Sequence, residues 1–311
     1  MINGIVNVYK ERGFTSHDVV AKLRGIFRQK KIGHTGTLDP DAEGVLPICL
    51  GKATKVCELL TDKDKEYEAV LLLGQTTDTQ DITGTVQEIL PVLCSEDEIR
   101  NIIAEFVGEY SQLPPMYSAL KVDGKKLCDL ARAGLEVART PRNVNIFSIE
   151  ILEMKLPRVK MRVHCSKGTY IRTLCHDIGA RAGCGGCMES LLRTRVAEFE
   201  VQKAKRLSEI EEKVWAVWAQ FPERELARED FAEFIQSTDS VFLQYPMVTV
   251  KKDFSRPLYN GNPLKPQWIL NWKDTYKEDL LRIYDANDAF AGIYQWDDLR
   301  NNIRPVKIFM E

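Results

Sequence analysis

The chain has 311 residues, a length that suits one large domain with a small one, or two domains of middling size. It carries 43 Lys and Arg against 45 Asp and Glu, which excludes a surface uniformly coated with positive charge. The opening residues lack the apolar run of a signal peptide, no window is apolar enough to cross a bilayer, and the eight cysteines are scattered as reduced thiols are, so we expect a cytoplasmic protein without a membrane partner.

Charge is unevenly distributed along the chain. Residues 1–60 hold nine Lys and Arg against six acidic residues, and residues 158–206 hold eleven against four. Residues 208–240 reverse the balance, with three against nine. The segregation is compatible with a basic face for a polyanion, and equally with chance clustering of surface charge.

The first sixty residues predict a strand and two helices. Gly4 to Val8 is typical of a short strand, and Thr15 is a candidate N-cap for an amphipathic helix over residues 16–28. A second helix is expected over residues 51–60.

Between these helices lies the stretch GHTGTLDPDAEGVLP, residues 33–47, whose pattern is that of neither a helix nor a half-buried strand. Pro40 pushes Asp39 out of the helical region, and the glycines permit tight bends and close approaches. We therefore expect a rigid loop that carries the Asp39 carboxylate. A lone Asp-Pro step would indicate only a turn.

The middle of the chain predicts a strand, a helix and a protruding element. Residues 67–73 are typical of a buried strand followed by the polar run TTDTQDITG, and residues 96–107 of an amphipathic helix. Asp123-Gly124 is a strong two-residue hairpin signal. Because residues 116–145 are basic, rich in turns and poor in large aliphatic side chains, we expect a protruding, mobile element there.

Further along, residues 159–165 alternate between apolar and basic side chains, which predicts a half-buried strand with a basic exposed face. The segment SKGTYIRTL predicts a turn followed by a helix. A strand over 190–199 is expected to carry Arg193 and Arg195 on one side, and the acidic segment 208–240 is expected to be helical. From about residue 246 the runs VTVKKDF, LYNGNPL, LRIYDANDAFAGIYQW and RPVKIFM predict a small all-β domain.

The sequence does not match the common motifs for binding a cofactor or a metal. The Asp39 loop has acidic residues at the offsets of a calcium-binding loop, but Leu50 stands where a bidentate glutamate is needed. Asp39-Pro40-Asp41 matches the DxD of phosphatases only weakly, because no apolar strand precedes it. Cys184 and Cys187 form a lone CxxC, whereas structural zinc generally needs four ligands. No nucleotide-binding glycine motif occurs, so we expect neither a metal nor a cofactor.

Six segments together resemble the TruB family of tRNA pseudouridine synthases. They are NVYKERGFTSHDVV, GHTGTLDPDAEGVLPICLGKATK, KEYEAVLLLGQTTDTQD, PPMYSALKVDGKKL, SKGTYIRTL and LLRTRV, in family order over nearly all of the first 200 residues. The resemblance implies an α/β (α+β) fold, with a mixed, mostly antiparallel sheet flanked by helices over residues 1–245. Residues 246–311 resemble the PUA RNA-binding module by position, by strand pattern and by YNGNPL.

The resemblance also implies a reaction. Uridine is converted to pseudouridine at position 55, in the T-loop of tRNA, after the base has been flipped out of the folded loop. Asp39 falls on the family's catalytic aspartate, Arg172 on its ion-pair partner, and Tyr67 on the tyrosine that stacks on the target base. No metal or cofactor is required.

The remaining matched residues concern RNA binding. Tyr170 and Leu192 fall on residues that line the family's pocket, and His34 on the histidine that helps to occupy the space left by flipped bases. Taken alone, His34 is also compatible with a general base, a ligand or a polar loop residue. Residues 116–145 match the family's thumb, which closes over the T-arm stem-loop.

Two alternatives remain open at this stage. One is a guide-RNA-dependent enzyme with the same chemistry, against which the compact chain without a basic tail counts. The other is an RNA-binding chaperone that folds tRNA without chemistry. For the tRNA-modifying enzyme we expect a monomer.

Overall fold

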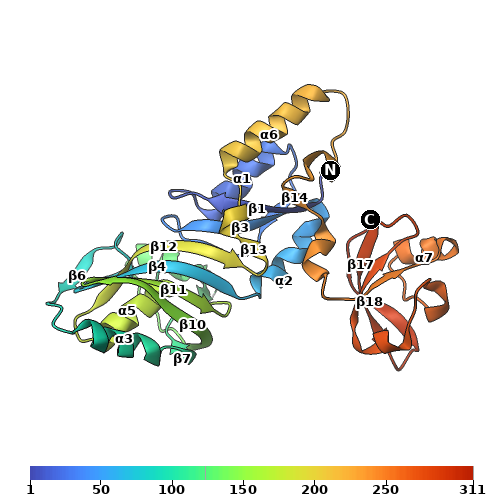
Figure 1. Ribbon diagram of the computed structural model, residues 1–311. Helices are drawn as coiled ribbons and strands as arrows, with labels where there is room; N and C mark the ends of the chain where they lie inside the picture. The colour runs from blue at the N-terminus through green and yellow to red at the C-terminus, as the bar shows by residue number, and fades with distance from the viewer. Residues whose placement is uncertain (123, 311) are drawn as a thin grey trace.

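A ten-stranded sheet organises the chain up to Gln236 in the computed structural model, which describes residues 1–122 and 124–310 (Figure 1). Its strands are β1 (Gly4–Lys10), β2 (Ile32–His34), β3 (Glu43–Leu50), β4 (Lys65–Leu73), β7 (Gly108–Gln112), β10 (Arg142–Lys155), β11 (Arg158–Cys165), β12 (Gly186–Val196), β13 (Phe199–Glu200) and β14 (Ile235–Gln236). The order is β14-β1-β3-β12-β4-β11-β10-β7, with β2 beside β3 and β13 beside β12. Of the described strand pairs in this sheet only β3 with β12 is parallel, so the predicted mixed, mostly antiparallel sheet is confirmed.

Helices cover the sheet in two groups (Figure 1). The apolar stripe of α5 packs with α3 against β4, β11 and β10, whereas α1 and α6 pack against β1 and β3. The helices of this part are α1 (Ser16–Ile26), α2 (Cys57–Thr61), α3 (Glu96–Glu105), α4 (Leu127–Arg132), α5 (Ile171–Arg181) and α6 (Leu207–Gln220).

Local sequence signals explain several of these elements. Thr15 caps α1 and forms a reciprocal capping box with Asp18, as its position predicted. The helix expected over residues 51–60 divides into a 3-10 turn, Gly51–Val56, and the short α2. On β11 the apolar residues are fully buried and the basic residues partly exposed, which confirms the predicted alternation.

One strand prediction was wrong. Arg193 and Arg195 do not share a side of β12, because a register irregularity lies between them: Arg193 opposes Tyr67 and Arg195 opposes Glu66. Neighbouring residues of β4 point to opposite faces, so this bulge turns Arg193 into the interior while Arg195 stays half-exposed.

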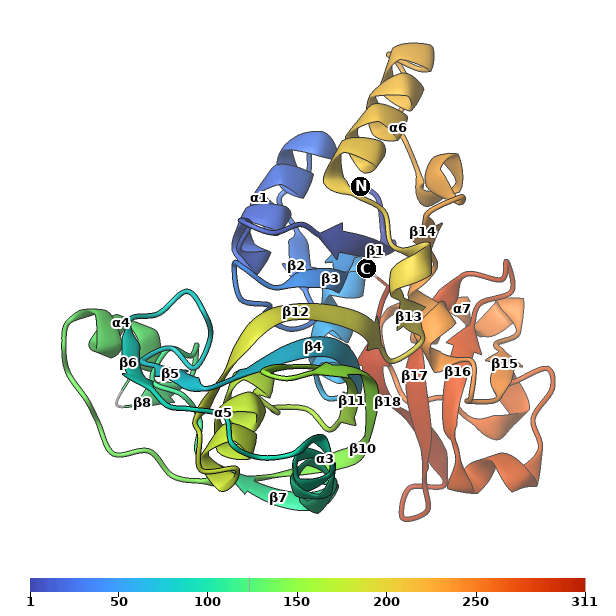
Figure 2. The ribbon, with the colours of Figure 1, turned by 60° about the vertical axis from the view of Figure 1, so that its left-hand side comes forward.

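The thumb, residues 116–145, contains the small hairpin β8 (Lys121–Val122) with β9 (Lys125–Lys126), followed by α4. Gly124 takes a positive φ of 81°, as the predicted turn requires, whereas Asp123 lies outside the described residues. A second hairpin, β5 (Gln75–Thr77) with β6 (Val86–Ile89), flanks the polar run after β4. In Figure 2 both hairpins lie at one end of β4 and β12.

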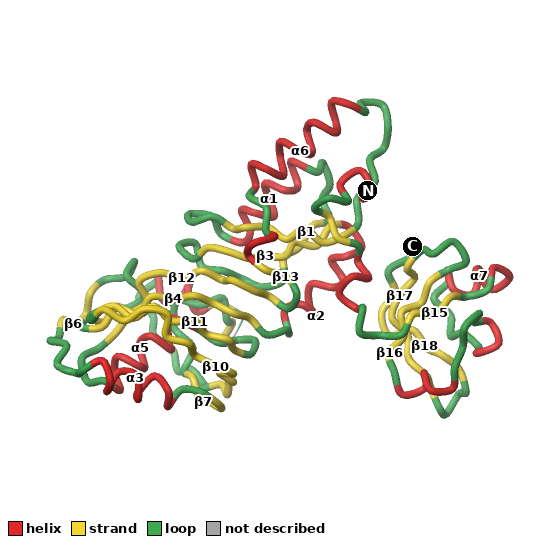
Figure 3. Tube along the Cα trace, viewed as in Figure 1, coloured by secondary structure: helices red, strands yellow, loops and turns green. Residues whose placement is uncertain are grey.

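A separate four-stranded sheet follows, in the order β15 (Met247–Thr249), β16 (Leu280–Tyr284), β17 (Phe290–Asp297) and β18 (Asn302–Ile308) (Figure 3). The expectation of an all-β part was too simple: the run LYNGNPL belongs to the end of helix α7 (Ser255–Tyr259) and its following turn. Short 3-10 turns occur at Val201–Lys203, Arg228–Phe231, Thr238–Phe242, Lys252–Phe254, Pro266–Trp268 and Asp274–Glu278.

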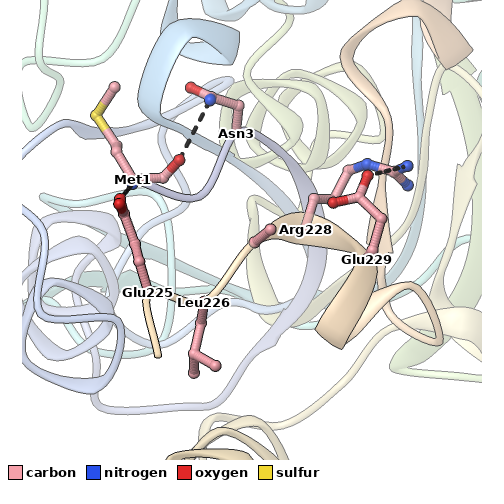
Figure 4. Close-up of a pocket in the computed structure, with 7 residues that line it drawn as sticks. Met1, Asn3, Glu225, Leu226, Arg228 and Glu229 are labelled. Atoms are coloured by element: carbon pink, nitrogen blue, oxygen red, sulfur yellow. Dashed lines mark hydrogen bonds and ion pairs between the residues drawn. The ribbon is translucent and has the colours of Figure 1, made fainter. Parts of the chain in front are cut away.

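Both ends of the chain are held against other segments. The N-terminal amino group lies 2.5 Å from a carboxylate oxygen of Glu225, in the segment after α6 (Figure 4). Near the other end, Lys55 Nζ donates to the carbonyl oxygen of Ile308 at 2.6 Å, and Phe309 packs with Phe242 in a shared apolar cluster. The second sheet is therefore in contact with the first part of the chain.

Candidate active site

A groove of about 900 Å³ opens beside the loop that joins β2 to β3. Its walls come from α1, this loop, β4, the turn between β5 and β6, the thumb, α5 and β12. The polar and charged residues of the lining include Arg12, Ser16, His17, His34, Asp39, Glu68, Asp81, Lys126, Asp129, Arg132, Lys160 and Arg172.

Backbone hydrogen bonds give the Asp39 loop one shape. The Leu38 N–H donates to the Ser16 hydroxyl oxygen at 2.9 Å, which ties the loop to the start of α1. The Lys10 ammonium is fully buried beneath the loop and donates to the carbonyl oxygens of Pro40 at 3.1 Å and Ala42 at 2.6 Å. Burial lowers the Lys10 pKa to about 8, and the nearby Asp39 acts in the opposite direction.

Asp39 faces Arg172 across the groove. Arg172 Nε lies 3.0 Å from Asp39 Oδ2, and its Nη2 lies 3.3 Å from Oδ1. The guanidinium is only 5% exposed, whereas the Asp39 side chain is 40% exposed toward the groove. A nearly side-on ion pair of this kind fixes the carboxylate orientation and still leaves it accessible to a ligand.

Burial raises the pKa of Asp39 above its ordinary value, Arg172 lowers it, and the neighbouring carboxylate of Asp81 raises it further. The carboxylate is thus more basic than a surface aspartate.

Asp81 is a member of this site that sequence reasoning missed. Its carboxylate lies 3.7 Å from Arg172 Nη1 and is held by the hydroxyls of Thr79 at 2.8 Å and Thr83 at 2.6 Å. Arg172 also donates to the backbone carbonyls of Thr79 and Tyr117, at 3.1 and 2.8 Å. The run TTDTQDITG was the available signal, because threonines alternating with aspartates form such internally bonded turns.

The other predicted site residues are divided between the groove and the layer behind it. His34 and Leu192 line the groove with Asp39 and Arg172. Tyr67 and Tyr170 are not among the described residues of the lining: Tyr67 is 8% exposed and packs in the core with Leu38, and Tyr170 is half-buried at the start of α5. Burial raises the Tyr67 pKa to about 12 and lowers the His34 pKa.

The basic face of β11 is less available to phosphate than the alternation suggested. Lys160 lies 2.9 Å from Glu68, and Arg162 lies 2.9 Å from Glu68 and 2.7 Å from Glu150. His164 contacts Asp64. Each cation on this face is therefore paired with a carboxylate. The thumb offers Lys126 and Arg132 to the groove instead.

Metal and membrane features are absent from the part of the chain that is described. No group of three His, Cys, Asp or Glu there could hold a metal ion. All eight cysteines are free thiols, and Cys184 and Cys187 of the CxxC are buried. No described helix combines the length and apolar character needed to span a bilayer.

Comparison with known proteins identifies the family. A profile described as TruB family pseudouridylate synthase, N-terminal domain, matches residues 24–171, and one described as tRNA pseudouridylate synthase B C-terminal domain matches residues 172–242. A protein from Lachnoclostridium phytofermentans named tRNA pseudouridine synthase B is 50% identical over 320 aligned positions, covering 99% of this chain and all of that one. The chain belongs to the TruB family of pseudouridylate synthases.

Other relatives extend the match. A TruB protein of Clostridium tetani with the same name is 43% identical over 94% of this chain and 96% of its own. Among solved structures, the chain is similar to one in a Cbf5-Nop10-Gar1 complex, with a TM-score of 0.71 and 29% identity over 99% of this chain and 85% of that one. A chain of an H/ACA ribonucleoprotein bound to a substrate RNA containing 2'-deoxyuridine gives a TM-score of 0.70 and 27% identity over the same shares. Like the relatives named tRNA pseudouridine synthase B, the chain is an isomerase.

Proposed function

We propose that the protein isomerises uridine to pseudouridine in the T-loop of tRNA, at position 55, with Asp39 as the nucleophile. The relatives named tRNA pseudouridine synthase B support tRNA as the substrate. The observation that carries the mechanism is the Asp39–Arg172 pair, 3.0 Å apart, at the edge of a groove of about 900 Å³. A nucleoside needs room of this order beside an oriented carboxylate.

The reaction breaks the N1–C1′ bond of uridine, turns the uracil and forms a C5–C1′ bond, while the proton on C5 is lost to a base and N1 gains a proton. The sum involves neither oxidation nor hydrolysis. Asp39 must be ionised to attack the uridine as a nucleophile. Arg172 favours the ionised form by lowering the Asp39 pKa, whereas burial raises it. The target base must leave its stack to reach this carboxylate, which costs a few kcal/mol that contacts in the groove return.

The remaining roles follow from this placement. Leu192 is proposed to line the pocket of the flipped nucleotide, and His34 to help occupy the space that flipped bases leave in the T-loop, because both line the groove. Tyr67 and Tyr170 lie one layer deeper, so stacking by Tyr67 requires the base to enter between the Asp39 loop and β4. We propose that the thumb closes over the T-arm, that residues 246–311 act as a PUA-like RNA-binding domain after a catalytic part of residues 1–245, and that the enzyme is a cytoplasmic monomer.

The test uses the purified protein and a T-arm hairpin RNA, with pseudouridine measured by chemical tagging and mass spectrometry. We expect the protein alone to convert one uridine, and Asp39→Asn to abolish conversion while RNA binding persists. Asp62→Asn is a matched control, because Asp62 is an exposed carboxylate that pairs with Lys167 at 2.8 Å and does not line the groove. Pseudouridine formed by Asp39→Asn would refute Asp39 as the nucleophile.

A guide-dependent function is the second candidate, because the solved neighbours at 27–29% identity include a Cbf5-Nop10-Gar1 complex and an H/ACA ribonucleoprotein. It predicts no conversion until a guide RNA and protein partners are added. A chaperone without chemistry predicts T-arm binding but no pseudouridine under any of these conditions. One assay therefore separates the three functions.

A further inference from the structure

Arg193 is a buried arginine without a carboxylate partner in the described part of the chain. Only 1% of Arg193 is exposed to solvent. Nε donates to the carbonyl oxygen of Val45 at 2.7 Å, and Nη1 donates to that of Thr37 at 3.4 Å. Nη2 is buried and has no hydrogen-bond partner among residues 1–122 and 124–310. Because burying an unpaired cation is costly, an arginine in this position calls for a functional explanation.

The sheet places Arg193 between the strand that follows the Asp39 loop and the strand that carries Tyr67. Across β12 and β4 it is paired directly with Tyr67, so both side chains lie on the same face. Across β12 and β3 it is paired with Gly44, just after the Asp39 loop. The carbonyls that it holds, Thr37 and Val45, bracket Asp39 on either side.

Tyr67, its cross-strand partner, is the group that favours the charged form of Arg193. Arg193 lowers the pKa of Tyr67, which burial raises to about 12. A guanidinium can only donate hydrogen bonds. A bond between the two groups therefore uses the Tyr67 oxygen as the acceptor and leaves the hydroxyl proton for another partner.

The groups around Tyr67 act on its pKa in opposite directions. Asp39 and the thiol of Cys165 on β11 lie close enough to Tyr67 to raise its pKa. Cations and a histidine surround Arg193 from three other strands, namely Lys10 on β1, His34 on β2 and Lys65 on β4. Burial outweighs the effect of Arg193, so the Tyr67 pKa stays above its ordinary value and the phenol keeps its proton.

We propose that Arg193 is a positioning residue for the isomerisation: it holds the two carbonyls that bracket Asp39 and donates through Nη2 to the Tyr67 oxygen. One buried cation thus fixes both the nucleophile loop and the ring beneath the nucleoside. The catalytic part rests on the proposed function, whereas the contact with Tyr67 does not.

The kinetic test compares Arg193→Met and Arg193→Lys with Arg195→Met. Arg195 is the matched control, because it lies two residues away on β12 and contacts Asp64 instead. Arg193→Met is expected to lower the single-turnover rate by about 10- to 100-fold, the effect of one charge-assisted hydrogen bond, with little change in T-arm affinity. Arg193→Lys keeps the charge but loses the planar set of N–H donors, so its rate should lie between those of the wild type and Arg193→Met. An equal loss in Arg195→Met would overturn the proposal.

A second measurement needs neither substrate nor turnover. The protein is labelled with ¹³C at the ring carbon that bears the tyrosine hydroxyl, and the Tyr67 signal is assigned by its disappearance in Tyr67→Phe. Both Arg193 variants should shift this signal at neutral pH, and Arg195→Met should not. If the wild type fails to modify T-arm RNA, the proposed function fails while this signal still tests the contact. An unshifted signal in folded Arg193→Lys refutes the contact, even if Arg193→Met does not fold.

Discussion

Arg172 reaches Asp39 with two of its nitrogens, at 3.0 and 3.3 Å, while its third nitrogen lies 3.7 Å from Asp81. The guanidinium is therefore shared between a carboxylate that faces the groove and one that is held by the turn after β5. The first carboxylate is the proposed nucleophile, and we expect the second to keep the arginine in position.

Asp81→Asn is expected to lower the single-turnover rate by about tenfold with little change in RNA affinity, because Arg172 loses one charged contact that orients it. The substitution also removes a negative charge that raises the Asp39 pKa, so the acid limb of the rate profile should move to lower pH. Asp78→Asn is the control, since Asp78 accepts a hydrogen bond from Thr85 in the same turn. A normal rate in Asp81→Asn would contradict the role assigned to Asp81.

The raised pKa of Asp39 predicts opposite effects on activity and stability. The proposed nucleophile must be ionised to react, so the rate should rise with pH through a value above the ordinary 3.8. A carboxyl group whose folded pKa is raised stabilises the fold below its unfolded pKa, and this stabilisation is lost as pH rises through the folded pKa.

It follows that Asp39→Asn should raise the melting temperature near neutral pH while it abolishes turnover, and that the gain should vanish at acidic pH. Thermal melts of both proteins across this pH range measure the difference. A variant that is less stable than the wild type at neutral pH would show that the Arg172 ion pair outweighs the cost of burial.

Gly44 is required by the close pairing of β3 with β12. A Cβ at this position would lie 2.2 Å from the carbonyl oxygen of Arg193, and the residue has a φ of 107°. Gly44→Ala should therefore destabilise the protein by more than about 2 kcal/mol and disturb the Asp39 loop. Gly13→Ala is the matched control, because Gly13 has a φ of 88° but no atom within 4 Å of an added Cβ. Equal melting temperatures for the two variants would contradict the steric argument.

The thumb cations are expected to contact RNA phosphates. Lys126→Ala combined with Arg132→Ala should weaken T-arm binding and reduce the slope of log affinity against log salt by about 1.5. Arg100→Ala serves as the control, because Arg100 lies on α3 in an i,i+4 pair with Glu96. Binding titrations between low and moderate salt measure both effects. An unchanged slope would exclude phosphate contacts by the thumb.

Regular elements could be predicted from the sequence because their signals are local. The capping residues of α1 and the alternation of β11 each lie within a short window, and the structure confirms both. The closeness of Asp39 to Arg172 was expected only through family motifs, since no periodicity connects residues so far apart. Their catalytic roles remain predictions.

The polar contacts behind the groove could not be predicted in this way. Lys10, Asp81 and Arg193 each bind groups on distant loops, helices or strands, and a charged residue considered alone is ordinarily assigned to the surface. The wrong prediction that Arg193 and Arg195 share a side of β12 shows why. A single bulge reverses the face of every residue beyond it, and the sequence pattern of β12 does not indicate where the bulge lies.

The pairing of Asp39 with Arg172 spans 133 residues, and that of Arg193 with Val45 spans 148. During synthesis on the ribosome, the Asp39 loop therefore emerges long before the strand and helix that complete its surroundings. A nascent chain that stops before β12 contains the proposed nucleophile, Asp39, but neither the β12 wall of the groove nor the buried Arg193 behind it. Activity should thus appear abruptly, only when folding has joined these late segments to the early ones, as expected for a topology of high contact order.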